Sequence, residues 1–197
     1  MIKPNFVLDL DQTIISAEPT EDFTKNTQKM KKFVFHNMDD YYIVFERPNL
    51  QEFLTFLFDN FTVSVWTAAT KDYALFIIDK IILAGNSNRK LDYVFFSYHC
   101  GISEDKKSAT KALSLFWDVY KLPNYSRTNT IILDDYDEVC KSQPKNCITA
   151  KPFEYNEDDS ENDTFLKELT PKLKDLLNVF HKTEDIARNI KLINKKS

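Results

Sequence analysis

The chain alternates short, β-rich apolar runs with longer segments in which apolar residues recur at helical spacing. This alternation predicts βαβ units, and therefore an α/β fold in which helices cover both faces of a mostly parallel sheet. The predicted strands are residues 6–10, 61–66, 91–98, 129–133 and 146–149. The predicted helices are residues 50–61, 73–82, 108–120, 165–180 and 184–193. Ligands bind such sheets at the carboxyl ends of the strands, so we expect the functional site there.

Three further features fall outside this alternation. Residues 32–36 and 41–46 flank the turn-rich stretch 37–40, and this pattern predicts a β-hairpin. The acidic residues over 157–163 are most simply a solvated surface loop. Pro171 lies inside the first of the two C-terminal helices, where we expect a kink or a step because proline removes a backbone hydrogen bond.

Glycine is scarce, with only two in 197 residues, Gly85 and Gly101. A P-loop needs two glycines five positions apart, and a dinucleotide-binding fingerprint needs two or three within six. Neither motif fits a pair that is sixteen positions apart. Any phosphate chemistry must therefore work without a glycine cradle. Gly85 follows the helix predicted over 73–82 and is expected to end it, since glycine is common just past a helix C-terminus.

Charge, cysteine content and hydropathy narrow the class of protein. Lys and Arg number 26 against 30 Asp and Glu, a net charge of −4, so the basic face of a nucleic-acid partner is not expected. The three cysteines, Cys100, Cys140 and Cys147, lack CxxC spacing and predict reduced thiols, without a disulfide or a zinc site. No apolar run approaches the roughly 18 residues of a membrane span, and no signal peptide precedes the first strand. We therefore expect a soluble, intracellular protein without a membrane partner.

Polar side chains lie at the ends of three predicted strands. Asp9 and Asp11 end the first, Thr67 follows the second, and Asp134 and Asp135 follow the fourth. Asp9 and Asp11 project the same way if the backbone stays extended, and with Asp135 they form a cluster of three acids. Like charges this close repel unless a cation neutralises them, and oxygen ligands favour Mg²⁺. The sequence therefore predicts a Mg²⁺ site at this edge of the sheet, with room for water and a phosphate.

Residues 7–14, which read Val-Leu-Asp-Leu-Asp-Gln-Thr-Ile, resemble the first motif of the haloacid dehalogenase superfamily. The order of the later segments resembles one branch of that superfamily, the small C-terminal-domain phosphatases, also called the NLI-interacting-factor-like family. These segments are Arg47-Pro48-Asn49-Leu50, Val65-Trp66-Thr67-Ala68-Ala69, Tyr73-Ala74, Thr110-Lys111-Ala112-Leu113-Ser114, Asn129-Thr130-Ile131-Ile132-Leu133-Asp134-Asp135, Gln143-Pro144 and Asp185-Ile186-Ala187-Arg188. The resemblance covers nearly the whole chain and implies a Rossmann-like fold and phosphatase activity.

The resemblance also bears on domain organisation. We expect one phosphatase domain over residues 1–197, with a core over about 1–155 and C-terminal helices over 163–193. Other members of the superfamily add a large cap domain over the site. The stretch between Thr67 and Lys111 is filled by a helix and a strand, so it leaves no room for such a cap. The predicted hairpin then serves only as a low flap, and the site stays open.

Carried over to this chain, the resemblance implies a role for each acid. Asp9 is the nucleophile that attacks phosphorus and forms an aspartyl-phosphate, which a carboxylate can do without an activating base. Asp11 is the general acid that protonates the leaving oxygen, and it then acts as base on the attacking water. Mg²⁺ is held by a carboxylate oxygen of Asp9, the main-chain carbonyl of Asp11 and the side chain of Asp135. The cation offsets charge between nucleophile and phosphate.

Four other residues support this chemistry in the family pattern. Thr67 hydrogen-bonds a phosphoryl oxygen, and Lys111 places a positive charge on the same group and holds Asp9 or Asp134. Asp134 is then structural, and Thr13 orients the first loop. Two other interpretations stay open, because Thr67 could instead cap the end of its strand and Lys111 could be a solvated helix lysine.

His99, Cys100 and Gly101 are expected in the loop after the third strand, near where this branch places substrate contacts, with Gly101 facing the substrate. A catalytic Cys–His pair is an alternative there, but nothing makes the thiol a better nucleophile than Asp9. Nearby aromatic residues could form a groove for a proline beside the phosphorylated residue, or they could pack in the core. These aromatic residues are Phe95, Phe96 and Tyr98.

An open site suits a phosphorylated protein segment, which is the partner that we expect. The resemblance implies phosphoserine or phosphothreonine, with the tail of RNA polymerase as one substrate class. A phosphatase for small molecules or nucleic-acid ends is an alternative, and so is a catalytically idle binding or scaffold module. The full set of acids, threonine and lysine argues against the idle module. Short members of this family occur in large DNA viruses, so a virus-encoded protein that acts in the host cell is one expectation.

Overall fold

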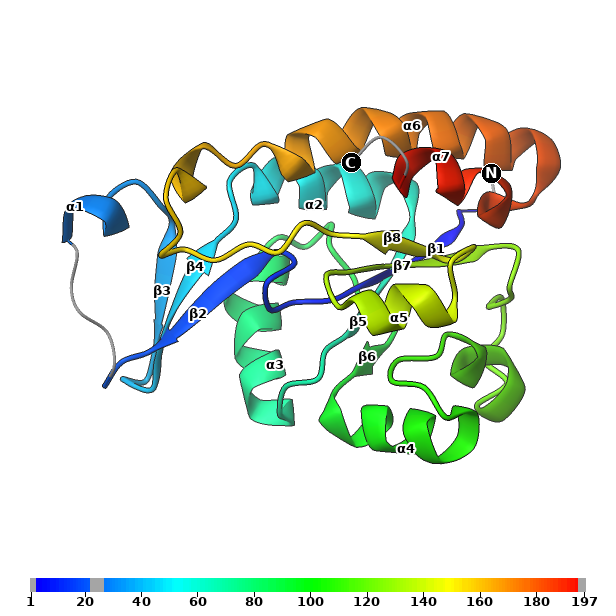
Figure 1. Cartoon of the computed structure of the whole chain (residues 1–197), viewed down its shortest axis with the longest axis horizontal. Coiled ribbons are helices and arrows are strands. Elements are labelled where there is room, and N and C mark those ends of the chain that lie inside the picture. Colours follow the sequence, from blue (N-terminus) through cyan, green and yellow to red (C-terminus); the bar gives the residue numbers. More distant parts are fainter. Residues whose placement is uncertain (1–2, 22–26, 195–197) are drawn as a thin grey trace.

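A five-stranded sheet forms the centre of the part of the chain that the computed structural model describes, residues 3–21 and 27–194 (Figure 1). Its strand order is β6-β5-β1-β7-β8, and every neighbouring pair is parallel. The strands are β1 (Asn5–Leu8), β5 (Thr62–Trp66), β6 (Val94–Phe95), β7 (Thr130–Asp134) and β8 (Cys147–Thr149). The predicted α/β class with a parallel sheet is confirmed, although β6 is much shorter than the strand predicted there.

Helices cover both faces of this sheet (Figure 1). Side chains alternate along β1, so Phe6 and Leu8 enter one apolar cluster and Val7 enters another. The larger cluster takes residues from α2 (Leu50–Asn60), α3 (Lys71–Ile77), α6 (Phe165–Thr183) and α7 (Ile190–Asn194). The smaller cluster takes residues from α4 (Ser97–Lys107), the π-helical segment η2 (Leu115–Val119) and α5 (Asp137–Ser142). Strands buried on both faces in this way explain the continuous apolar runs in the sequence.

Most of the predicted helices are present, with some differences in their bounds. The helix predicted over 73–82 is α3 followed by the π-helical η1 (Ile78–Leu83), and it ends as expected near Gly85, whose φ is +68°. The last predicted helix is divided into η4 (Ile186–Asn189) and α7. α6 continues through Pro171, so no break in the helix separates its two halves.

A second sheet, which we call the flap, has the order β2-β4-β3 in the described part of the chain and is antiparallel (Figure 1). Its strands are β2 (Ile15–Pro19), β3 (Phe35–Met38) and β4 (Tyr42–Glu46), and α1 (Thr27–Met30) lies between the first two in the chain. The predicted hairpin is confirmed as β3 and β4. β2 is not predicted from the sequence; it begins just after the loop that contains Asp9 and Asp11 and pairs with β4. Phe45 of the flap stacks on Tyr155 at 3.7 Å and fastens it to the chain after β8.

The largest error of prediction lies between β6 and β7. The helix predicted over 108–120 is wrong, because Ser108 and Lys111 have φ angles of +54° and +53°. Left-handed backbone at these two residues ends α4 and interrupts any helix before η2. Instead, α4 contains His99, Cys100 and Gly101, so the predicted loop is wrong as well.

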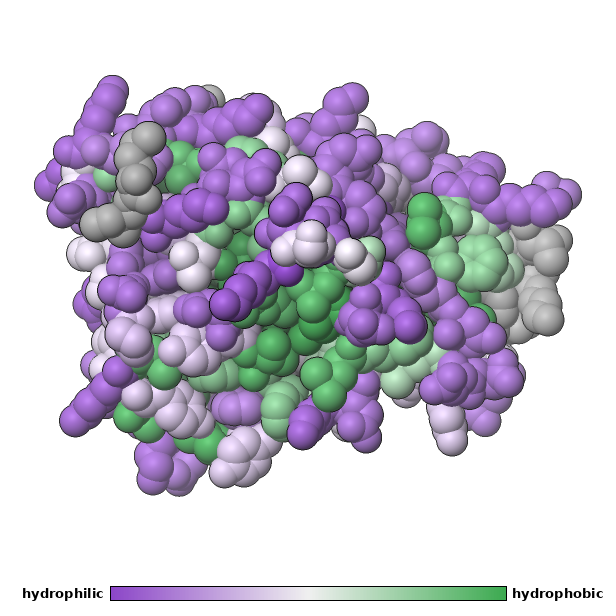
Figure 2. All heavy atoms as spheres, turned by 180° about the vertical axis from the view of Figure 1, so that it is seen from behind, coloured by the Kyte–Doolittle hydropathy of each residue, from purple (hydrophilic) through white to green (hydrophobic). Residues whose placement is uncertain are grey.

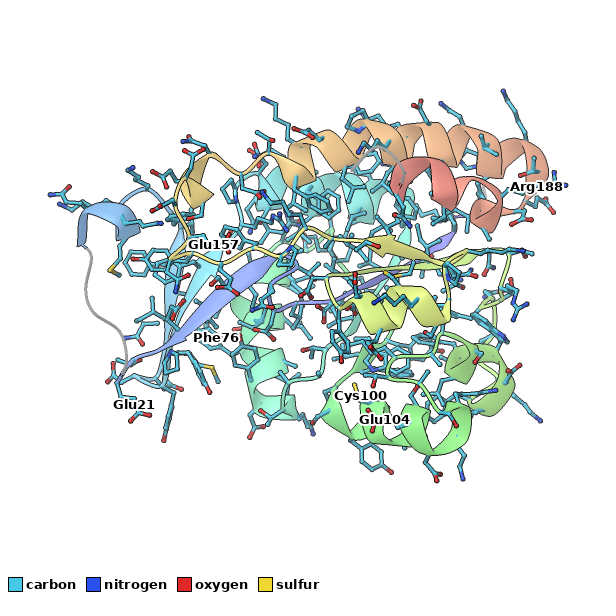
Figure 3. The ribbon with its side chains drawn as sticks, in the orientation of Figure 1. Glu21, Phe76, Cys100, Glu104, Glu157 and Arg188 are labelled. Carbon is cyan, nitrogen blue, oxygen red and sulfur yellow. A yellow bond between two sulfur atoms is a disulfide. The ribbon has the colours of Figure 1, made fainter. Side chains whose placement is uncertain are left out.

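Cys140 and Cys147 form a disulfide that joins α5 to β8. Their Cα atoms lie 5.0 Å apart, which is within the normal range for a disulfide. The prediction of reduced thiols is therefore wrong for this pair, because cysteine count and spacing do not reveal which elements pack side by side. Cys100, on α4, is buried and is the free cysteine of the described residues (Figure 3).

The acidic stretch over 157–163 is mostly exposed, as predicted, but its last residue is not. Asp163 receives two hydrogen bonds of 2.8 Å from the guanidinium of Arg47, which is 1% exposed. Arg47 also donates to the carbonyl oxygens of Thr13 and Lys151, at 2.9 and 2.8 Å. This arginine therefore ties the loop after β1 to the C-terminal part of the chain. The 3-10 turn η3 (Ser160–Asn162) precedes Asp163.

The surface carries both hydrophilic and hydrophobic side chains. On the face seen in Figure 2, hydrophilic residues predominate and hydrophobic residues gather towards the middle. Among the helices of the described residues, none combines the length and the apolar character that crossing a membrane would require.

Candidate active site

Segments that are far apart in sequence meet beyond the carboxyl ends of β1, β5 and β7. Asp9 follows β1, Thr67 follows β5 and Asp134 ends β7, while Lys111 comes from the turn after α4. All four side chains are buried, with exposed fractions of 4% or less. The burial of charged groups costs free energy unless they are paired with one another. The pairing among these charges therefore defines the site.

Lys111 joins the two aspartates. Its Nζ atom donates to Oδ1 of Asp9 at 2.5 Å and to Oδ2 of Asp134 at 2.8 Å. Burial alone lowers the pKa of Lys111, but the charges of Asp9 and Asp134 outweigh burial and hold the pKa above its usual value. The lysine therefore stays protonated. The interpretation of Lys111 as a solvated helix lysine is wrong, since it is neither solvated nor in a helix.

The strained backbone of Lys111 is held by a side chain from α5's C-terminal end. Gln143 donates from Nε2 to the carbonyl oxygen of Lys111 at 2.9 Å, and its Oε1 accepts from the backbone N–H of Leu113 at 2.9 Å. Left-handed backbone at a residue with a side chain costs energy and persists only where its surroundings hold it. Here the bridge by Gln143 fixes the turn from which Lys111 reaches Asp9.

Thr13 links the loop after β1 to the end of β7. Its hydroxyl donates to Oδ2 of Asp9 at 3.0 Å and lies 3.2 Å from Oδ1 of Asp135. The same oxygen accepts from the backbone N–H of Asp135 at 3.2 Å. With Lys111 on one carboxylate oxygen of Asp9 and Thr13 on the other, the carboxylate of Asp9 is fixed at both oxygens.

Three acids of this site lie close enough together to share a cation. One carboxylate oxygen from each of Asp9, Asp134 and Asp135 lies within 4.8 Å of the other two. Burial raises the pKa of Asp135 to about 6, with help from the charge of Asp9, and the same two causes raise the pKa of Asp134. An all-oxygen donor set with excess negative charge fits a hard divalent cation such as Mg²⁺.

The side chain of Asp11 is not part of this cluster, so the predicted cluster of Asp9, Asp11 and Asp135 is wrong in one member. It receives a hydrogen bond of 2.5 Å at Oδ1 from the hydroxyl of Tyr73, on α3. Burial raises the pKa of Asp11 and the nearby charge of Asp9 raises it further, whereas the hydrogen bond from Tyr73 works against them. A raised pKa favours the protonated form of this carboxyl group, which is the form that a general acid needs. Tyr73 in turn meets the ring of Tyr42, on β4 of the flap, edge to face at 5.5 Å.

The structure shows Thr67 as the strand-end cap that the sequence left open as an alternative, and the cap leaves the phosphate-binding role possible. Its Oγ1 accepts from the backbone N–H of Ala69 at 3.0 Å, which is the strand-end cap. The hydroxyl proton takes no part in that bond, so it can still be donated to a phosphoryl oxygen. Behind it, the thiol of Cys100 lies 3.7 Å from the carbonyl oxygen of Thr67, and burial raises the thiol's pKa.

Comparison with known proteins shows which family this chain belongs to. A family model described as NLI interacting factor-like phosphatase matches residues 4–186. The chain belongs to this family. Over 180 residues it is 46% identical to the CTD phosphatase-like protein 355R of Invertebrate iridescent virus 6, covering 88% of this chain and 97% of that protein. The protein of the same name from Invertebrate iridescent virus 3 is 41% identical, with coverages of 87% and 96%.

Solved structures agree on the fold. Fcp1, described as an essential RNA polymerase II CTD phosphatase, aligns with a TM-score of 0.67 at 17% identity, covering 95% of this chain and 69% of that one. A protein described as a beta-phosphoglucomutase from Thermotoga maritima aligns with a TM-score of 0.50 at 12% identity, covering 87% and 99%. The chain is therefore an NLI-interacting-factor-like phosphatase with the haloacid dehalogenase fold, as the motifs predicted.

Sequence reasoning missed one side chain at the site of this family member and misplaced others. Tyr73 belongs to a motif of the family, but its position six residues after Thr67 does not reveal that its hydroxyl reaches Asp11. The Cys–His pair is not supported, since His99 instead stacks on Phe95 and its Nδ1 accepts from the backbone of Phe96.

Of the two interpretations of the aromatic residues, packing in the core is confirmed for two of the three. Phe95 is buried at 6% exposure in the smaller apolar cluster, and Phe96 packs against the larger one. Tyr98 is 67% exposed. Two of the three rings therefore belong to the core, because α4 starts at Ser97 and turns the chain away from the strand that was predicted there.

Proposed function

We propose that this chain is a Mg²⁺-dependent phosphatase that removes phosphate from serine or threonine side chains of a protein segment through an aspartyl-phosphate on Asp9. The observation that carries the proposal is the fixed carboxylate of Asp9, with Lys111 at one oxygen and Thr13 at the other. A carboxylate held in this way is oriented to attack phosphorus without an activating base.

In the first step, an oxygen of Asp9 forms a bond to phosphorus as the bond from phosphorus to the seryl or threonyl oxygen breaks. Asp11 gives its proton to that leaving oxygen. In the second step, water attacks the phosphorus of the aspartyl-phosphate, Asp11 takes a proton from the water, and Asp9 is released with inorganic phosphate. Lys111 and the hydroxyl of Thr67 stabilise the negative charge on the phosphoryl oxygens in both steps.

Phosphatases of this fold generally use Mg²⁺, and we assign its ligands to Asp9, Asp135 and the main-chain carbonyl of Asp11. When bound, the cation supplies positive charge between the nucleophile and the phosphate. Asp134 lies near enough to be a ligand too. However, one of its oxygens accepts from Lys111 and the other from the backbone N–H of Tyr136, so we assign it to holding the lysine.

A protein segment as substrate is supported by the architecture and by the names of the relatives. Within the described residues, the flap is the one sheet added beside the core, and no separate cap domain lies between β5 and β7. Such a site leaves room for a phosphorylated side chain that projects from a polypeptide. The viral relatives at 46% and 41% identity are named for C-terminal-domain phosphatases.

Hydrolysis of p-nitrophenyl phosphate tests the chemistry. We expect activity with Mg²⁺, its loss in excess chelator, and its recovery when Mg²⁺ is restored. Asp9→Asn should lower kcat by on the order of 10³-fold or more, because an amide cannot form the covalent intermediate. Asp175→Asn, at an exposed position on α6, controls for the change of acid to amide. Unchanged activity in Asp9→Asn would exclude the aspartyl-phosphate mechanism.

The substrate class needs a separate experiment. Phosphoserine and phosphothreonine peptides, nucleoside monophosphates, a phosphorylated DNA end and sugar phosphates should be compared by kcat/KM. We expect the peptides to be at least about tenfold better, since a bound chain uses more of the open surface than a small molecule does. A preference for nucleotides or sugars would keep the mechanism and overturn the assignment to proteins. An inactive chain that still binds phosphopeptides would support the scaffold alternative.

A further inference from the structure

We propose that a basic pocket on the side of the sheet covered by α4 and α5 binds a small organic phosphate with a planar ring, of the nucleoside monophosphate class. The pocket has a volume of about 550 Å³ and lies between α4, η2, α5 and the turns that precede β7 and β8. Asp9, Asp11, Thr67 and Asp135 are not among the described residues that line it. It is therefore separate from the phosphatase site, and the inference does not depend on the proposed reaction.

The charge of this pocket is unusual for the chain. Lys107, Arg127 and Lys145 line it, and no acidic residue does so among those that the structure describes, although the chain has a net charge of −4. A second pocket, of about 390 Å³ beside the start of α6, has six acidic lining residues and two lysines. A concave surface with positive charge alone attracts an anion.

Two of these cations are not neutralised from within the protein. Lys107 is paired with Asp118 at 2.6 Å. In the described part of the chain, by contrast, the guanidinium of Arg127 and the ammonium of Lys145 make no hydrogen bond or ion pair. Both side chains are free to turn towards a phosphate, and Arg127 can hold two of its oxygens at once.

The pocket also offers groups that a bare phosphate would not use. The indole of Trp117 lines it, half-buried and packed against the smaller apolar cluster. The hydroxyls of Ser108 and Ser114 also line it and have no hydrogen-bond partner among the described residues. An aromatic face favours stacking with a planar ring, and hydroxyls suit the polar edge of a base or a sugar. The volume is also within the range of small-molecule sites.

The wall of this pocket continues into the turn that carries Lys111. Ala112 and Gln143 both line the pocket. Gln143 is the residue whose carboxamide holds the backbone of Lys111 and Leu113. An occupant of the pocket would therefore contact the side chain that fixes the position of Lys111.

Calorimetric titration of the full chain with AMP tests the inference, with adenosine and inorganic phosphate as separate arms. We expect AMP to bind more tightly than either. In the variant R127Q/K145Q the affinity for AMP should fall about tenfold or more, as expected for the loss of two charge-assisted contacts. Both side chains are exposed, so the variant should fold normally. The variant K151Q/K172Q, which loses the same charge at the other pocket, should bind AMP like the native chain.

Tryptophan fluorescence separates this pocket from the phosphatase site. Trp66 is fully buried, whereas Trp117 lines the pocket, so AMP should quench the native chain and leave W117F almost unquenched. Two results would overturn the proposal. One is equal AMP affinity in the native chain and in R127Q/K145Q, which would place the nucleotide elsewhere. The other is binding of inorganic phosphate as tight as that of AMP, which would leave no role for the ring.

Discussion

Two groups of side chains approach the reacting centre, and they are held in different ways. The lysine cluster (Asp9, Lys111 and Asp134) is at most 4% exposed and is joined by hydrogen bonds of 2.5 and 2.8 Å. The tyrosine chain (Asp11, Tyr73 and Tyr42) runs from a half-buried acid to a flap residue that is 36% exposed. It depends on one hydrogen bond and one ring contact.

The difference lies in what each group must satisfy. In the lysine cluster, two buried carboxylates need the positive charge between them, so removal of one member leaves an uncompensated charge in the interior. In the tyrosine chain, the contacts only orient a carboxyl group and connect it to the flap. The structure therefore predicts large losses of both stability and activity on the lysine side, and smaller effects that depend on the substrate on the tyrosine side.

The largest effect is expected for Lys111→Met. Methionine fills similar space but leaves Asp9 and Asp134 without their shared cation, which should lower the free energy of unfolding by about 3–5 kcal/mol. Urea unfolding in the presence of a chelator measures this, because Mg²⁺ could otherwise replace part of the missing charge. Activity towards p-nitrophenyl phosphate should fall by at least about 10²-fold, the effect expected when a group that stabilises transition-state charge is lost.

The matched control for that variant is Lys107→Met. Lys107 also pairs with an aspartate, Asp118, but this carboxylate is half-exposed. Solvent screens such pairs, so its loss should change the free energy of unfolding by less than about 1 kcal/mol. If the two variants proved equally stable, the lysine cluster would not be the interior ion pair that the geometry describes.

A smaller effect is expected for Tyr73→Phe, which removes only the hydroxyl that donates to Asp11. Loss of the hydrogen bond that orients the carboxyl group of Asp11 should lower kcat for a phosphoserine peptide by about tenfold. The seryl oxygen of this peptide is a poor leaving group, so it needs the proton that Asp11 supplies. p-Nitrophenol leaves readily without a proton, so kcat for p-nitrophenyl phosphate should change by no more than about twofold. Parallel measurement of kcat and KM on both substrates gives the comparison.

The contrary outcome is equally informative. If Tyr73→Phe lowered kcat for both substrates to the same extent, the hydroxyl would be supporting the fold or the phosphate contacts and not the acid. Asp11→Asn provides the reference for complete loss of the acid, and its ratio between the two substrates should exceed that of Tyr73→Phe.

The smallest effect is expected for Tyr42→Leu. The edge-to-face contact with Tyr73 is worth about 0.5–1.5 kcal/mol, so its loss should lower peptide turnover by about two- to tenfold while sparing p-nitrophenyl phosphate. The neighbouring Tyr41, at 72% exposure, provides the control, and Tyr41→Leu should leave both rates unchanged. Equal effects of the two substitutions would show that the flap does not influence Asp11 through Tyr42.

The acids of the site could be predicted because local pattern determines them. An apolar strand that ends in Asp9, or in Asp134 and Asp135, places carboxylates at the functional edge of any parallel sheet. Lys111 was predicted from a motif but placed in the wrong element. Its left-handed backbone depends on Gln143, which lies 32 positions away in sequence. Propensity favours a helix over this segment, and a tertiary contact overrides it.

Other features depend wholly on which elements pack together. The disulfide between Cys140 and Cys147 follows from α5 lying beside β8. The ion pair of Arg47 with Asp163 joins residues 116 positions apart, so an acidic stretch that reads as a solvated loop ends in a half-buried contact. Composition and spacing contain no information about such pairs.

The sequence by itself therefore determined the sheet, the acids at its edge and the family, because strand ends and motif order are local properties of the chain. The tertiary structure alone decided which atoms meet. It placed Lys111 between two carboxylates, the hydroxyl of Tyr73 on Asp11, and three cations around a pocket with no acid among its described lining residues. Such meetings depend on burial and on charge compensation between distant segments, which are properties of the packed molecule.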